Sequence, residues 1–206
     1  MRPSLPSQRD TGPEPDPGVL LVDGIDGSGK TWFAGRLVDA MRAAGAEVEL
    51  AHVDDYRCPV SWNDPAGEAA VYWERYFDLV ALERDLAALA RPGLIVVLEG
   101  IFTLRVPALA AAPLVYLEVD YEVAAERILR RDTAIGRTAE DVRHRIEARY
   151  FPAQRRYRAE YAPTERASAL VDSTDPACPR LIRSDWSRLP APAVLALRQL
   201  FPVFAG

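Results

Sequence analysis

A stretch of eight residues near the N-terminus has the residue types and spacing of a phosphate-binding loop. It reads Gly24-Ile25-Asp26-Gly27-Ser28-Gly29-Lys30-Thr31 and matches the pattern G-x-x-x-x-G-K-[ST]. In such a loop the glycines let the backbone turn its N–H groups inward, the lysine contacts the β- and γ-phosphates, and the hydroxyl binds Mg²⁺. Lys30 is the only lysine among the 25 Lys and Arg residues. We therefore expect residues 24–31 and Trp32 to bind a nucleotide, with Lys30 catalytic and Thr31 a metal ligand.

The segments on either side of this loop have the order that the motif requires. Residues 19–23 form an apolar run that is typical of a buried parallel strand. After the loop, Phe33, Leu37 and Met41 recur at helical spacing, and Gly45 is a plausible end for the helix. The pattern predicts a strand, a glycine-rich loop and a helix in succession.

Further along the chain, strand patterns alternate with helix patterns. We expect strands at 47–53, 94–98, 114–119 and 169–172, and helices at 68–90 (as one or two helices), 121–131, 138–150 and 193–201. Such alternation predicts an α/β protein with a parallel sheet. The expected architecture is a three-layer P-loop NTPase fold, with a five-stranded parallel sheet, helices on both faces and a small Arg-rich lid at about 127–140.

Acidic residues follow several of the expected strands. Asp54 and Asp55 follow the second strand, Glu99 the third and Asp120 the fourth. Ligands of such sheets bind at the carboxyl ends of the strands. Asp54 is our candidate for the base that accepts a hydroxyl proton, with an acidic turn or helix cap as the alternative. Glu99 is a candidate Mg²⁺ ligand, with a capping or salt-bridge role as the alternative.

Arginines of the lid segment could cover the charge that develops on a transferring phosphate. The candidates are Arg127, Arg130, Arg131 and Arg137. We assign catalysis to Arg131 and Arg137 and interpret the other two as surface residues. A second set of arginines is interpreted as a solvated helical face: Arg143, Arg145, Arg149, Arg155, Arg156 and Arg158.

A cluster of aromatic residues has two possible roles. The cluster could form a wall that stacks on a base, or it could pack in the core, which we expect for most members. Its members are Trp62, Tyr72, Trp73, Tyr76 and Phe77.

The two histidines, His52 and His144, are not part of any catalytic or metal-binding motif, and we assign neither a role.

Composition restricts the compartment and the class of partner. The formal net charge of −5 argues against a nucleic-acid-binding surface. Two cysteines with no metal spacing suit a reducing cytoplasm. The longest apolar run, 106–117, is too short to span a membrane and contains two prolines. Residues 1–18 form a Pro-rich segment that we expect to be a disordered tail, leaving 19–206 as a single domain.

Five stretches together resemble the uridine kinase-like P-loop nucleoside kinases, a group related to phosphoribulokinase and type-I pantothenate kinase. The resemblance covers roughly residues 19–180. The stretches are Gly24 to Thr31, Asp54-Asp55-Tyr56, Leu98-Glu99-Gly100-Ile101, Arg127-Ile128-Leu129-Arg130-Arg131-Asp132 and Tyr150-Phe151-Pro152-Ala153-Gln154.

The resemblance implies an enzyme that uses ATP and Mg²⁺ to phosphorylate a small-molecule hydroxyl, often a nucleoside 5′-hydroxyl. It implies that the first Asp of the second stretch, Asp54, is the base, and that Tyr56, Asp64 and Gln154 contact the acceptor. Family members are often homo-oligomers. No His follows Asp64, the lid is one residue short between Asp132 and Arg137, and Ile135 lies where an Arg is usual. The acceptor therefore stays open between a uridine- or cytidine-like nucleoside, pantothenate, a sugar and a nucleoside-like natural product.

Two other classes of protein share the phosphate loop. One is a nucleotide-dependent switch that controls a partner, but the guanine-reading motif [NT]-K-x-D cannot occur because the only lysine is Lys30. The other is a nucleotide-binding protein that has lost catalysis. The joint presence of Lys30, Thr31, Asp54 and Glu99 argues against it.

Overall fold

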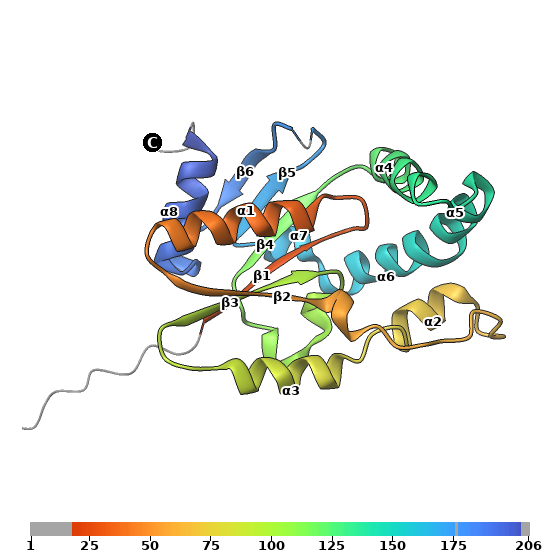
Figure 1. Ribbon diagram of the computed structural model, residues 1–206, viewed down its shortest axis with the longest axis horizontal. Helices are drawn as coiled ribbons and strands as arrows, with labels where there is room; N and C mark the ends of the chain where they lie inside the picture. The colour runs from red at the N-terminus through yellow and green to blue at the C-terminus, as the bar shows by residue number, and fades with distance from the viewer. Residues whose placement is uncertain (1–17, 176, 203–206) are drawn as a thin grey trace, which may run out of the picture.

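The protein, described by a computed structural model over residues 18–175 and 177–202, is organised around a six-stranded sheet (Figure 1). The strands lie in the order β2-β3-β1-β4-β5-β6. They are β1 (Gly18–Gly24), β2 (Glu47–His52), β3 (Leu94–Gly100), β4 (Leu114–Glu118), β5 (Ala169–Asp172) and β6 (Arg180–Ser184). The tail expected at 1–18 lies outside the described residues, apart from Gly18, which begins β1.

α-Helices connect β1 to β2, β2 to β3 and β4 to β5. The α-helices are α1 (Lys30–Ala43), α2 (Glu68–Glu74), α3 (Leu79–Leu89), α4 (Tyr121–Ala134), α5 (Ala139–Arg145), α6 (Phe151–Tyr161), α7 (Pro163–Arg166) and α8 (Ala191–Leu200). Short 3₁₀ turns within the described ranges are η1 (Val53–Tyr56), η2 (Thr103–Arg105), η3 (Pro107–Leu109) and η5 (Trp186–Arg188), and η4 (Ile146–Tyr150) is a π-helical turn. The expected helix at 68–90 is thus two helices, and Asp78 caps the second by accepting from the Ala81 N–H at 2.9 Å.

The central strands are apolar because helices cover both faces of the sheet. Every residue of β3 is buried. On one face Leu37 of α1 and Leu197 of α8 belong to one buried cluster with the sheet, and on the other Leu82 of α3 and Tyr157 of α6 belong to a second. Figure 1 shows α1 and α8 on one side of the sheet and α3 on the other. The predicted three-layer α/β fold is confirmed.

The expected number of strands was one too few. Strands β1 to β5 pair in parallel as predicted, whereas β6 adds an antiparallel strand beside β5. Within β6 only Leu181 is buried, and arginines flank the strand interior. A short edge strand with exposed charges lacks the apolar run that reveals a central strand, so its pattern is that of a loop.

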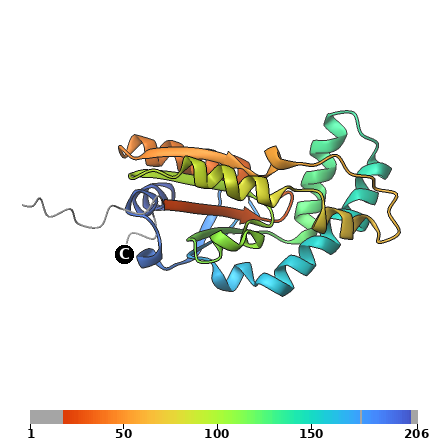
Figure 2. The same ribbon diagram turned by 90° about the horizontal axis from the view of Figure 1, so that it is seen from below.

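The order of the strands creates a crevice at the carboxyl end of β1. β2 and β3 lie on one side of β1, and β4, β5 and β6 lie on the other. Ligands of open α/β sheets bind where the connections diverge in this way. The register pairs Val22 with Glu99 and Asp23 with Gly100, so the end of β3 lies beside the start of the phosphate loop. Figure 2 shows β1 pointing toward the end of the molecule where α4 and α5, in green and teal, gather.

Over the described ranges, no helix is both long and apolar enough to cross a membrane.

The β5–β6 edge contains an ion pair that should contribute stability in a pH-dependent way. Arg180 Nη2 donates to Asp172 Oδ2 at 2.6 Å, and this bond, with one from Thr174, lowers the pKa of Asp172 from 3.8 to about 2. A lowered folded-state pKa means that the contribution is complete above about pH 4 and is lost as the pH falls toward 2. Because Arg180 is largely exposed, solvent screens the pair and we expect only a small contribution to stability.

We predict that Asp172→Asn lowers the free energy of unfolding slightly at pH 7 and by less at pH 3.5. Urea denaturation of the wild type, Asp172→Asn, Arg180→Gln and the double variant measures the coupling. A coupling that is equally large at both pH values would contradict this explanation.

Candidate active site

The phosphate loop joins β1 to α1 and leaves the first turn of that helix open. Gly29 precedes α1 with φ 84°, a conformation in which a residue with a side chain is strained. No side chain caps this end of the helix, and its first turn contains no acidic residue. The helix therefore presents unpaired backbone N–H groups and the positive end of its dipole, as an anion site requires.

The loop is held closely against α4. Gly27 has φ 81°, and a Cβ atom at this position would lie 2.6 Å from the carbonyl oxygen of Ala124. Arg127, one turn further along α4, donates to the Gly27 carbonyl at 3.1 Å and to the carbonyls of Ser173 and Thr174 at 2.9 and 2.6 Å. Our interpretation of Arg127 as a surface residue was wrong. The arginine ties the loop to the segment after β5, a contact between residues 100 apart in sequence that no local pattern reveals.

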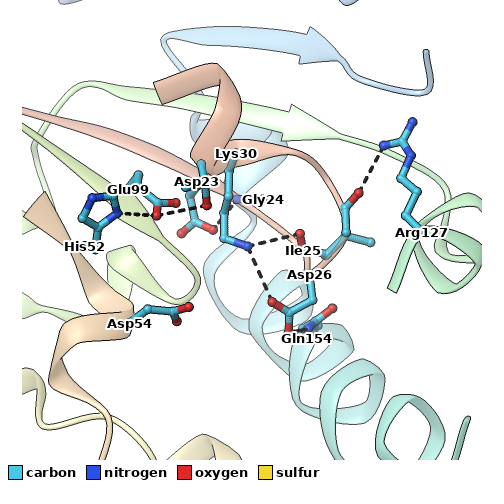
Figure 3. Close-up of polar contacts among 12 residues, drawn as sticks. Asp23, Gly24, Ile25, Asp26, Lys30, His52, Asp54, Glu99, Arg127 and Gln154 are labelled. Carbon is cyan, nitrogen blue, oxygen red and sulfur yellow. Dashed lines mark hydrogen bonds and ion pairs between the residues drawn. The ribbon is translucent and has the colours of Figure 1, made fainter. Parts of the chain in front are cut away.

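Lys30 and Asp26 face one another across the loop (Figure 3). The Lys30 ammonium lies 3.6 Å from Asp26 Oδ1 and 3.5 Å from the carbonyl oxygen of Ile25. Asp26 Oδ2 also accepts from Tyr72 OH at 3.0 Å and from Gln154 Nε2 at 2.8 Å. Burial and the neighbouring Asp26 raise the pKa of Tyr72 well above its usual value, so the phenol stays protonated and donates. One loop carboxylate thus anchors α2, α6 and the lysine.

Thr31 and Glu99 come together although they are 68 residues apart. The Thr31 hydroxyl donates to Glu99 Oε1 at 3.2 Å. Glu99 is buried, and among the described residues its Oε2 atom has no hydrogen-bond partner. Leaving a buried carboxylate oxygen unpaired is costly, and an unpaired oxygen beside a hydroxyl suits a hard cation.

These two residues therefore fit Mg²⁺, which needs few protein ligands when phosphates and water complete its shell. In the ranges 18–175 and 177–202, no three His, Cys, Asp or Glu side chains are grouped so as to form an all-protein metal cage.

His52, to which the sequence assigned no role, contacts the same carboxylate. Its Nδ1 atom lies 2.7 Å from Glu99 Oε1. The sheet register pairs His52 directly with Glu99, since β2 and β3 end together. A signal was present in the sequence, because His52 lies near the end of the second expected strand, 47–53, and Glu99 directly follows the third, 94–98. The imidazole fixes which way the carboxylate points.

Asp54 lies in η1, immediately beyond β2. Its side chain is 58% exposed, and its carboxylate is 3.5 Å from the Arg57 guanidinium. The preceding Val53 is fully buried against Gly100, where a Cβ atom would lie 2.4 Å from the Val53 Cβ. Gly100 thus allows η1 to pack closely on β3, which sets the position of Asp54. Figure 3 shows Asp54 and Asp26 on either side of Lys30.

A cavity of about 370 Å³ opens beside the loop, and most of its polar lining is charged. It is lined by Asp26, Asp54, Arg57, Cys58, Pro59, Val60, Trp62, Tyr72, Tyr76, Arg131, Arg137, Arg145, Arg149 and Tyr150. The cavity brings Asp54 together with both arginines that the sequence selected from the lid. It lies directly against the phosphate loop through Asp26.

One buried carboxylate holds the two lid arginines. Asp132 in α4 accepts from Arg131 Nε at 2.7 Å through one oxygen and from Arg137 Nη1 through the other. Burial alone would raise the pKa of Asp132, but the two guanidinium groups outweigh burial and lower it. Asp132 stays ionised at neutral pH and keeps both arginines at the cavity.

Three of the predicted acceptor residues, Tyr56, Asp64 and Gln154, do not line this cavity. The Tyr56 hydroxyl donates to Asp85 Oδ2 at 3.2 Å, toward α3. Asp64 pairs with Arg75 at 2.6 Å, and this bond lowers the pKa of Asp64. Gln154, the third, is buried and reaches the site through Asp26, while its Oε1 atom has no partner within the described part of the chain.

The interpretation of the second arginine set as a solvated face was wrong for two members. Arg145 and Arg149 line the cavity, and Arg149 is buried. Arg149 donates to Glu68 Oε2 through Nε at 2.9 Å and Nη2 at 2.7 Å, and its guanidinium stacks 3.3 Å from the Trp62 ring centre. His144 contacts the other Glu68 oxygen at 2.8 Å. These bonds fasten α2 to the segment after α5, where the π turn alters the helix register, as such turns often do at functional sites.

Some residues of the aromatic cluster line the cavity, and the others are buried in the core. Trp62, Tyr72 and Tyr76 line the cavity, and the Trp62 and Tyr76 rings are 5.3 Å apart. Trp73 and Phe77 are buried in the core. Trp32, predicted to contact nucleotide, is half exposed at the start of α1, with the Arg36 guanidinium 5.0 Å from its ring.

Comparison with solved structures supports the fold. The "putative fructose transport system kinase" of Silicibacter sp. TM1040 aligns with a TM-score of 0.58 at 18% identity, over 71% of this chain and 87% of that chain. The "possible uridine kinase" of Bacillus stearothermophilus aligns with a TM-score of 0.54 at 20% identity, over 74% of this chain and 87% of that chain. No protein-family model matches the sequence, and no curated protein matches it either. The resemblance to uridine kinase-like P-loop kinases is therefore confirmed at the level of the fold.

We predict that Arg127→Gln weakens nucleotide binding because the carbonyls of Gly27, Ser173 and Thr174 lose a charged donor. Hydrogen bonds of this kind contribute roughly 1.5–3 kcal/mol, so the Kd for ATP should rise about tenfold or more. Calorimetric titration with ATP and Mg²⁺ measures the change. The matched control is Arg130→Gln, which removes the same charge from an exposed position of α4 and should leave Kd unchanged. Equal effects of the two substitutions would show that Arg127 acts only through its charge.

Proposed function

We propose that the protein is a small-molecule kinase, which transfers the γ-phosphate of ATP to a hydroxyl group. The observation that carries the proposal is the cavity beside the phosphate loop, which contains a carboxylate, Asp54, and the lid arginines Arg131 and Arg137. Phosphoryl transfer to an alcohol requires a phosphate clamp, an acceptor site, a proton acceptor and cationic cover for the developing charge. Each requirement has a side chain or backbone group at this place.

In the proposed reaction, the acceptor oxygen attacks the γ-phosphorus as the bond from that phosphorus to the β,γ-bridging oxygen breaks. The hydroxyl proton goes to Asp54, and ADP leaves with the bridging oxygen. Lys30 and the N–H groups at the start of α1 hold the phosphates. Arg131 and Arg137 neutralise charge on the transferring group. The Asp54 side chain is 58% exposed and lines the cavity, so an acceptor hydroxyl in the cavity can reach its carboxylate.

The oxygens of Thr31 and Glu99 would hold Mg²⁺, which supplies charge neutralisation on the phosphate oxygens when bound. His52 orients Glu99 through the contact described above. The buried position of Glu99 keeps its carboxylate in a fixed orientation.

The proposal covers more than one kind of acceptor. The family resemblance implies a nucleoside 5′-hydroxyl of the uridine or cytidine type, and the Trp62, Tyr72 and Tyr76 rings of the wall suit a planar base. Pantothenate, a sugar or a nucleoside-like natural product is the alternative. These alternatives include neutral and anionic compounds, so the charge of the cavity wall bears on the choice between them.

A regulatory nucleotide-binding protein is the competing function. A switch needs the phosphate loop and a segment that responds to the γ-phosphate. It does not need a second cavity with a carboxylate beside that loop. Asp54 and its cavity therefore favour the kinase.

We predict that Asp54→Asn lowers kcat by at least about 10²-fold with little change in the Kd for ATP, because the amide cannot accept the proton. Release of ADP in the presence of an acceptor measures turnover. Asp55→Asn is the matched control, since Asp55 is the exposed neighbour and does not line the cavity. Undiminished turnover of Asp54→Asn would remove Asp54 as the base.

We also predict that Lys30→Ala lowers kcat/KM for ATP by at least about 10²-fold, because the phosphates lose a cation that the transition state needs. Lys30→Arg should restore little of this, since a planar guanidinium cannot replace the compact ammonium beside Asp26. Wild-type kcat/KM in Lys30→Ala would overturn the phosphate-clamp assignment.

A further inference from the structure

Guanidinium groups dominate the charge of the cavity beside the phosphate loop. Five arginines line it, against two aspartates, Asp26 and Asp54. The arginines are Arg57, Arg131, Arg137, Arg145 and Arg149. In a protein with a formal net charge of −5, the lining of this cavity thus has an excess of guanidinium groups over carboxylates.

Three carboxylates outside the lining hold four of these five arginines. Asp132 holds Arg131 and Arg137, Asp141 accepts from Arg145 Nε at 2.9 Å, and Glu68 holds Arg149. None of these three carboxylates lines the cavity. Each carboxylate binds only one edge of a guanidinium group, which has five N–H donors in all. Other N–H donors therefore stay available, and the cavity is lined by many hydrogen-bond donors and few acceptors.

Phosphoryl transfer accounts for only part of this charge. Arg131 and Arg137 extend from the lid and are assigned to the transferring phosphate. Arg145 and Arg149 lie four residues apart on the segment from α5 into η4, so their side chains project on the same side. Arg149 is further immobilised on the Trp62 ring and by Glu68. Two positioned guanidinium groups remain that the chemical step does not require.

A neutral nucleoside matches such a wall poorly. Its ribose hydroxyls and base N–H groups need acceptors, and the charged acceptors of the lining are Asp54 and Asp26. Asp26 already accepts from Tyr72 and Gln154 and pairs with Lys30. A carboxylate or a phosphate monoester consists of acceptors only and fits the fork of an arginine with two parallel bonds.

We propose, on the basis of the kinase function proposed above, that the phosphate acceptor is itself an anion. It is a hydroxyl compound that carries a carboxylate or a phosphate group, and Arg145 and Arg149 bind that group while Asp54 takes the hydroxyl proton. This inference separates the acidic acceptors from the neutral nucleosides and sugars.

The first test is ADP release with ATP and Mg²⁺ against three sets of hydroxyl compounds. The neutral set is uridine, cytidine and ribose, the carboxylate set is pantothenate and glycerate, and the phosphate set is ribose 5-phosphate and ribulose 5-phosphate. We expect acceptor-dependent release from the second or third set, and the set that responds identifies the source of the anionic group. Higher kcat/KM with a neutral compound than with every anion would overturn this inference and leave the kinase function standing.

The second test uses a matched pair of variants in α5. Arg145→Gln removes a cavity guanidinium, whereas Arg143→Gln removes the same charge from an exposed position of the same helix that does not line the cavity. We expect the first to raise KM for the anionic acceptor roughly 10- to 100-fold and the second to leave it unchanged. The KM for ATP should change less than about twofold in both.

A binding measurement keeps the proposal testable without a substrate. Inorganic phosphate is titrated into the protein saturated with Mg²⁺ and a non-hydrolysable ATP analogue, so that the nucleotide site is filled. Binding that is lost in Arg145→Gln and retained in Arg143→Gln supports the anion site. Equal binding to both variants, or none to the wild type, overturns it. If no compound of the panel stimulates ADP release and the wild type binds no ATP, the kinase function fails as well.

Discussion

The site depends on keeping the phosphate loop curled with its backbone N–H groups turned inward, and most of the surrounding structure serves that constraint. The loop cannot be stabilised by a side chain at Gly27, because a Cβ atom there would collide with the backbone of α4. Support comes from outside instead. Arg127 binds the Gly27 carbonyl, and Tyr72 and Gln154 bind Asp26. At the start of the loop the buried Asp23 accepts from the Gly24 N–H, the Thr103 hydroxyl and the Tyr157 hydroxyl.

Asp23 supports the loop as a fully buried carboxyl group with several hydrogen-bond donors around it. Burial raises the pKa of the carboxyl even though several hydrogen bonds oppose the shift. A buried carboxyl without partners would be destabilising, whereas one with donors on both oxygens joins β1, η2 and α6 into a unit. Three helices and one 3₁₀ turn thus converge on the loop and on Asp23, the residue before it. We therefore expect the affinity for phosphate to depend on residues outside the loop.

The cavity beside the loop is organised by carboxylates that do not line it. Asp132 and Glu68 are each bonded to two cationic or imidazole partners, and in both the partners outweigh burial and lower the pKa. Removing either carboxylate would leave a guanidinium partly buried without its counter-charge, which is more costly than losing the pair altogether. Asp132 joins α4 to the turn before α5, and Glu68 joins α2 to η4. The same bonds that fix the lid therefore fix the charge of the cavity.

The sequence by itself determined the phosphate loop, the succession of strands and helices, and the strand-terminal acids Asp54 and Glu99, because these follow from local spacing and from the rule that strand ends share one edge. It could not show β6, whose edge position leaves one buried residue and therefore little apolar pattern. The roles of His52, Arg127 and Arg149 were decided by tertiary structure. Each acts on a partner 47 to 100 residues away, and a periodic surface pattern does not distinguish an arginine that faces solvent from one that faces a cavity. Tertiary structure alone also turned Tyr56 and Asp64 toward other partners, since which neighbour a side chain meets depends on how the helices pack.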